Sequence, residues 1–205
     1  MGSRVISAVI RILELAALDC RRGGLRIDTG EIIAMTRRWL ERSVIGLNLC
    51  PFAEGPYRGG RVRFVVSEAR SAAGLLGELG SELDVLQAAD PVTLETTLLI
   101  HPWVLHDFLE YNDFLDAADA LVAKLGLEGE LQVASFHPRY QFAATRYDDI
   151  ENFTNRSPYP MMHLLREASV ERAIAAVGDT EEIYRRNIRT LRDLGLAGWE
   201  RLWSD

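Results

Sequence analysis

The sequence contains little cysteine: only Cys20 and Cys50 occur among its 205 residues. Such a low count provides no disulfide framework and favours a reducing, cytoplasmic location. The two cysteines are also too far apart to form a C-x-x-C pair, so the usual cysteine-based zinc motif is absent.

Long apolar runs are lacking as well. The longest stretch, Val5–Leu18, is interrupted by Arg11 and Glu14 and is too short to span a bilayer, and it has no clear signal-peptide cleavage site. We therefore expect no membrane association and predict an N-terminal helical extension over residues 1–34, followed by one domain over 35–205. The Met-Gly-Ser opening is typical of a tag remnant, and Met35 is an alternative natural start.

The chain has no excess of positive charge, since 23 Lys and Arg face 30 Asp and Glu for a net charge of -7. This balance argues against a nucleic-acid partner, because phosphate neutralisation needs a basic face, but it still allows a local basic pocket for a small anion. Neither a G-x-G-x-x-G fingerprint nor a P-loop is present, and no H-E-x-x-H motif indicates a zinc protease. The expected partner is a small molecule.

Hydrophobic periodicity and turn residues indicate an α/β fold. In order, they predict a helix over 36–49, a loop over 50–60, a strand over 61–67, a helix over 71–89, a strand over 96–100, a helix after Pro102, a strand over 131–136, an irregular segment over 138–159, and helices over 160–177 and 180–194. Strands that alternate with helices pair in parallel through crossover connections. We therefore expect a single domain with a small, mainly parallel sheet of three to four strands, flanked by helices.

Two predicted strands end on the same dipeptide, His-Pro. His101 follows T-T-L-L-I and His137 follows L-Q-V-A-S-F. Ligands bind beyond the carboxyl ends of parallel strands, and adjacent strands lie about 4.8 Å apart, so we predict that the two imidazoles share one site there. His163, expected near the start of a helix, is a third candidate for that site.

The residue types around these histidines suggest chemistry. Three neutral imidazoles can hold Zn²⁺, Fe²⁺ or copper with positions left open, so His101, His137 and His163 form the predicted transition-metal site. The hypothesis is a metal-dependent enzyme, a hydrolase or an oxidoreductase, that acts on a small anionic substrate. Expected catalytic residues are Cys50, Tyr140 and Arg156; expected substrate-binding residues are Asn155, Arg156, Tyr159 and Arg166.

Two alternatives stay open. In a metal-free enzyme, Cys50 would be the nucleophile, His137 or His101 the base, and Arg156 the group that holds the substrate. In a non-enzymatic ligand-binding module, the histidines would only satisfy carbonyl groups at the strand ends, and Cys50 would be a buried apolar residue. A homodimer is compatible with either alternative.

Several longer segments carry a resemblance. W-L-E-R-S-V-I-G-L-N-L-C-P-F-A, T-T-L-L-I-H-P, Q-V-A-S-F-H-P-R-Y-Q-F and N-R-S-P-Y-P-M-M-H-L-L-R-E occur in this order between about residues 36 and 195. Together they resemble a bacterial family catalogued as a domain of unknown function (number 1415). The resemblance implies no activity, but it places six residues in the family's signature segments: Cys50, His101, His137, Asn155, Arg156 and His163.

Overall fold

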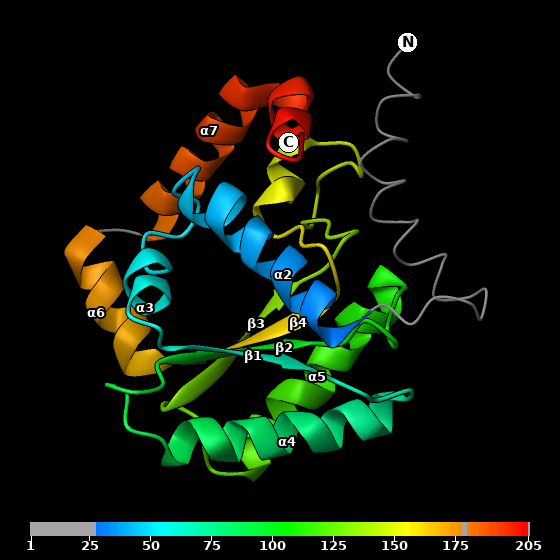
Figure 1. Ribbon diagram of the computed structural model, residues 1–205, viewed down its shortest axis with the longest axis vertical. Helices are drawn as coiled ribbons and strands as arrows, with labels where there is room; N and C mark the ends of the chain where they lie inside the picture. The colour runs from blue at the N-terminus through cyan, green and yellow to red at the C-terminus, as the bar shows by residue number, and fades with distance from the viewer. Residues whose placement is uncertain (1–27, 178–179, 205) are drawn as a thin grey trace.

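The computed structural model describes residues 28–177 and 180–204 (Figure 1). Its elements are α2 (Thr29–Trp39), the π-helix η2 (Leu40–Ile45), α3 (Glu54–Arg58), β1 (Val62–Val66), α4 (Ala72–Ala88), β2 (Thr96–Ile100), α5 (Phe108–Lys124), β3 (Leu131–Phe136), the 3-10 helix η3 (Ile150–Thr154), β4 (Met161–Arg166), α6 (Glu167–Val177) and α7 (Thr180–Arg201). Within these residues, no helix combines the length and the apolar character needed to cross a bilayer.

The helix predicted to start at Thr36 begins earlier, at Thr29, and continues past Trp39 as a π-helix. Ile32, in its second turn, is fully buried against the sheet, so this turn contributes to the core. Most of the predicted N-terminal extension, residues 1–27, lies outside the described residues.

The four strands form a mixed sheet in the order β1-β2-β4-β3. β1 and β2 are parallel, but β4 runs antiparallel to both β2 and β3, so the prediction of a mainly parallel sheet is wrong. The cause is Met161–Arg166, which we expected to lie in the first two turns of a helix over 160–177 and which instead pairs with strands on both sides. β1, β2 and β3 still point in one direction, but β2 and β3 lie two strand spacings apart, about 10 Å.

Helices cover both faces of the sheet (Figure 1). α4 and α5 pack on one face around Leu99, and α2 packs on the other face around Leu98. Neighbouring residues of a strand point to opposite faces, so a fully buried strand such as β2 supplies both cores. This alternation decides which face each functional side chain reaches.

Local signals set the helix ends on the α4–α5 face. The Ser71 hydroxyl accepts a hydrogen bond from the Gly74 N–H at 3.1 Å, and the Asp107 carboxylate accepts from the Leu109 N–H at 2.9 Å. Asp107 therefore starts α5 five residues after Pro102, where we had expected the helix to begin, and leaves a turn between β2 and α5. Gly126, with φ of 71°, takes the left-handed conformation that ends the helix.

Candidate functional site

His101 and His137 lie at the same edge of the sheet, but each forms a hydrogen bond to the turn that contains Val104 and Leu105. The His101 Nδ1–H donates to the Val104 carbonyl at 3.1 Å, and the His137 Nε2–H donates to the Leu105 carbonyl at 3.2 Å. The tautomer of His137 follows from its other nitrogen, because Nδ1 accepts from the Arg139 N–H at 3.0 Å. Leu105 has φ of 57°, an uncommon conformation for a residue with a side chain, so the two imidazoles secure a strained turn.

Tyr111 packs against both rings. Its ring centroid is 5.6 Å from that of His101 and 5.1 Å from that of His137. Burial lowers the pKa of His101 to about 3 and the pKa of His137 to about 4, so both imidazoles are neutral at physiological pH. The repeated His-Pro dipeptide is thus explained by packing and hydrogen bonding around one turn.

His163 lies on the opposite face of the sheet. It pairs in register with Leu98 of β2 and with Ala134 of β3, and Leu98 belongs to the core under α2. The predicted convergence of His163 with His101 and His137 is therefore wrong, because Tyr111 and the other two rings pack on the α5 face. Among the described residues, no group of three or more His, Cys, Asp or Glu is arranged to hold a metal ion.

Arg156 is directed at main-chain carbonyls of the segment that follows β3. Its Nε donates to the Tyr140 carbonyl at 3.2 Å, its Nη2 donates to the Tyr147 carbonyl, and its guanidinium lies 4.5 Å from the centroid of Phe153. The Trp39 indole N–H in turn donates to the Arg156 carbonyl at 2.9 Å. Arg156 therefore ties the irregular segment to α2, and Tyr140 contributes its main chain to this contact.

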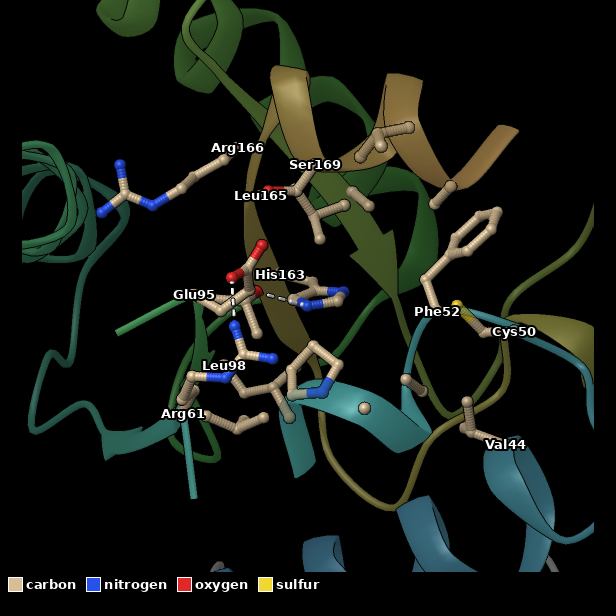
Figure 2. A pocket seen from close by; sticks show the side chains of 18 of the residues that line it. Val44, Cys50, Phe52, Arg61, Glu95, Leu98, His163, Leu165, Arg166 and Ser169 are labelled. Carbon is tan, nitrogen blue, oxygen red and sulfur yellow. Dashed lines mark hydrogen bonds and ion pairs between the residues drawn. The ribbon is translucent and has the colours of Figure 1, made fainter. Parts of the chain in front are cut away.

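Asn155 and Arg166 are also engaged with the protein, whereas the buried Tyr159 hydroxyl has no hydrogen-bond partner among the described residues. Asn155 donates to the Ser135 carbonyl at 3.1 Å. Tyr159 is buried in the core under α2, where burial raises the pKa of its hydroxyl to about 12. Arg166 donates through Nη2 to the carbonyls of Leu86, Ala89 and Leu94. It joins the end of α4 to β4, and its side chain points away from His163 and Cys50 (Figure 2).

A cavity of about 630 Å³ lies between the α2 face of the sheet and the helices α3 and α6; we call it the sheet-face pocket. Side chains from all four strands form its floor, and apolar groups such as Trp39, Phe136 and Val170 make up most of its wall. Leu40 and Val44 of the π-helix η2 also line it. π-Helical turns occur frequently at functional sites, and a mainly apolar concavity with a few polar groups is typical of ligand pockets.

His163 is the polar centre of this pocket. Its ring projects from β4 into the space between α6 and the segment that carries Cys50 and Phe52 (Figure 2). The Thr96 hydroxyl donates to the Leu164 carbonyl at 2.6 Å, so its oxygen accepts from the His163 Nε2–H at 2.7 Å. This pair fixes the tautomer and leaves Nδ1 as an acceptor without a hydrogen-bond partner in the part of the chain that the structure describes. Burial lowers the pKa of His163 to about 4, so this acceptor is unprotonated at neutral pH.

One end of the pocket is charged. Arg61 Nη1 lies 2.6 Å from a Glu95 carboxylate oxygen, and Arg172 Nη2 lies 3.8 Å from the other oxygen (Figure 2 shows the first pair). Arg61 directly precedes β1 and Glu95 directly precedes β2, and these strands are parallel with Val62 opposite Thr96. This end therefore lies at the amino ends of β1 and β2, across the sheet from His101 and His137.

Cys50 also lines the pocket, from the loop before α3. Burial raises the pKa of its thiol, and hydrogen bonds from the main-chain N–H groups of Phe52 and Ala53 partly oppose that effect. The thiol is therefore protonated at neutral pH. Three predicted site residues therefore line the pocket: Cys50, His163 and Arg166, of which Arg166 turns its guanidinium group toward the end of α4.

Sequence reasoning missed Thr96, Arg61, Glu95 and Arg172. A usable signal existed for two of them, because Arg61 is the first residue of one predicted strand, Glu95 stands one residue before the next, and the two carry opposite charges. Parallel pairing of the two strands places these residues side by side at the amino ends of the strands, whereas the predicted site lay at the carboxyl ends. Thr96 and Arg172 had no such signal, since their positions depend on β4 and α6.

Comparison with known proteins places the chain in a family. No curated protein and no solved structure matches it. A family model described as "Protein of unknown function (DUF1415)" matches residues 31–201, which include every element from the body of α2 to the end of α7. The chain therefore belongs to this family of proteins of unknown function.

Proposed function

We propose that the protein binds a small molecule in the sheet-face pocket, with His163 as the hydrogen-bonding anchor. The observation that carries the proposal is the His163 Nδ1 lone pair, which faces an apolar cavity of about 630 Å³ and has no partner among the described residues. Few donors compete for this acceptor in a mainly apolar pocket, and a ligand with an O–H or N–H group would form a hydrogen bond with it.

The protonation state of His163 supports binding more strongly than proton abstraction. With its pKa lowered to about 4 and its Nε2–H held by a threonine, the ring is a weak base at neutral pH. A fixed neutral imidazole is, however, well suited to recognise one donor group in an otherwise apolar site.

The test uses a neutral fluorescent probe, N-phenylnaphthylamine (NPN), whose emission rises in apolar sites. Ala173→Trp places a large side chain on the α6 wall of the pocket, whereas Ala175→Trp adds the same group at an exposed position of the same helix. We expect saturable NPN binding to wild type and to Ala175→Trp, and its loss in Ala173→Trp with thermal midpoints preserved. Equal binding to all three proteins would place the probe elsewhere and refute the proposal.

A second candidate function is covalent catalysis by Cys50. Its support is that Cys50 lines the same pocket as His163 and that the main-chain N–H groups of Phe52 and Ala53 lower the pKa of its thiol, against the larger effect of burial. His163, on the same face, replaces His101 and His137 as the partner that this hypothesis requires. The test is the rate of iodoacetamide labelling at neutral pH in wild type and in His163→Asn. Catalytic use predicts faster labelling than a model thiol and a slower rate in the variant; a rate below that of the model thiol in both would refute it.

A further inference from the structure

The charged end of the sheet-face pocket is more positive than the protein as a whole. Its lining includes Arg61, Arg166 and Arg172 against the single carboxylate of Glu95, while the whole chain carries a net charge of -7. Because Arg166 is turned toward the end of α4, the groups that face the pocket are two guanidinium groups sharing one carboxylate. One positive charge is left uncompensated there.

Arg61 has hydrogen-bonding capacity to spare. Its bonds to Glu95 at 2.6 Å and to the Pro91 carbonyl at 3.4 Å both use Nη1. Nη2 and Nε therefore have no partner within residues 28–177 and 180–204. The Arg61 side chain is 30% exposed and that of Glu95 is 11% exposed, so this pair is partly buried in the pocket wall.

Arg172 lies at the mouth of the pocket, on α6. Its side chain is 67% exposed, and Nη2 contacts the Ser169 hydroxyl at 2.8 Å and Glu95 at 3.8 Å. Glu95 thus orients both guanidinium groups, one at the mouth and one deeper. Two guanidinium groups that line one pocket and share one carboxylate supply the N–H donors that recognise a planar or tetrahedral anion.

We propose that the ligand of the sheet-face pocket is an amphipathic anion, with an apolar body on the sheet floor and a carboxylate or similar group held by Arg61 and Arg172. The inference rests on the proposed binding function and adds the chemical class of the ligand. Glu95 is a positioning residue that holds the two guanidinium groups and does not itself bind the anion.

The experiment compares two probes that differ by one charged group. Anilinonaphthalene sulfonate (ANS) is NPN with a sulfonate added, so any difference in their binding reports the contribution of the anion. We expect Arg172→Gln to weaken ANS binding about fivefold and Arg61→Gln about tenfold, while NPN affinity changes by less than about twofold. The control is Arg185→Gln, which removes a similarly exposed arginine on α7, 65% exposed against 67%, and should leave both probes unaffected.

Salt supplies a second readout. ANS affinity should fall between low and high ionic strength, whereas NPN affinity should not, because only the charged probe is screened. Equal effects of Arg172→Gln and Arg61→Gln on the two probes, or no effect on either, would overturn the anion inference while leaving pocket binding intact. Failure of both probes to respond to Ala173→Trp would instead overturn the proposed function, so the two failures are distinguishable.

Discussion

The two histidines that hold the Val104–Leu105 turn make a sharp prediction about acid stability. His101 is 0% exposed and His137 is 1% exposed, and their pKa values are lowered from 6.5 to about 3 and to about 4. Above pH 6.5, both rings are neutral in the folded and the unfolded chain, and their full contribution to stability is present. As the pH falls below 6.5, the unfolded chain binds protons that the folded chain cannot, so stability is lost down to the folded pKa values.

The magnitude follows from the depth of the shift. One pH unit corresponds to about 1.4 kcal/mol per proton. At pH 5, each ring therefore lowers the free energy of unfolding by about 2 kcal/mol relative to pH 6.5 and above, and the two rings together lower it by about 4 kcal/mol. That loss is a large part of the free energy of unfolding of a typical domain, which is about 5 to 15 kcal/mol. We therefore expect the urea midpoint to fall steeply between pH 6.5 and 5, a range in which most carboxylates are still ionised.

Variants separate this effect from general acid sensitivity. At pH 7.5, His137→Gln should be less stable than wild type, because it disturbs the hydrogen bonds to Leu105 and from Arg139. At pH 5, the gap should shrink by about 2 kcal/mol, since the variant has no buried imidazole to keep unprotonated. Urea unfolding followed by tryptophan fluorescence at both pH values measures the gap, and Arg185→Gln serves as a surface control. A gap that is constant with pH would refute the assignment of a buried, neutral His137.

Three further predictions follow from single contacts. Thr96→Val removes both the acceptor for His163 Nε2 and the donor to the Leu164 carbonyl, and should lower the free energy of unfolding by about 1 to 3 kcal/mol in urea titrations. Arg166→Met leaves three carbonyls at the end of α4 without their donor, and we expect a loss of about 3 kcal/mol that Arg166→Lys partly restores. Asn48, with φ of 52°, should tolerate glycine, whereas Asn48→Val should cost about 1 to 2 kcal/mol by thermal denaturation.

Each of these predictions has an outcome that contradicts it. An unchanged urea midpoint in Thr96→Val would mean that the hydroxyl does not connect β2 with β4. Arg166→Lys as unstable as Arg166→Met would mean that the reach and geometry of the guanidinium group, and not its charge, matter at the end of α4. Asn48→Val as stable as Asn48→Gly would show that the turn after η2 does not require the left-handed conformation.

Much of the fold could be predicted from local patterns. The strands over 96–100 and 131–136 and the helix α4 were identified from apolar runs, periodicity and flanking breakers, all of which are properties of short segments. The placement of His101 and His137 at one edge was also predictable, because it needs only that β2 and β3 point the same way. The sequence by itself therefore determined the parts of the sheet that depend on neighbouring residues.

Tertiary structure decided the rest. Met161–Arg166 is a short apolar run that suits either a helix or a buried strand, and it became a strand because β2 and β3 offer hydrogen bonds on both of its sides. The face of the sheet on which a strand residue lies is decided only when the strand's register is fixed. The residues next to His163 in the sequence therefore could not show that it lies on the opposite face from His101 and His137. The sheet-face pocket gathers Cys50, Arg61 and His163 from distant segments, and long-range pairing alone brings such side chains together.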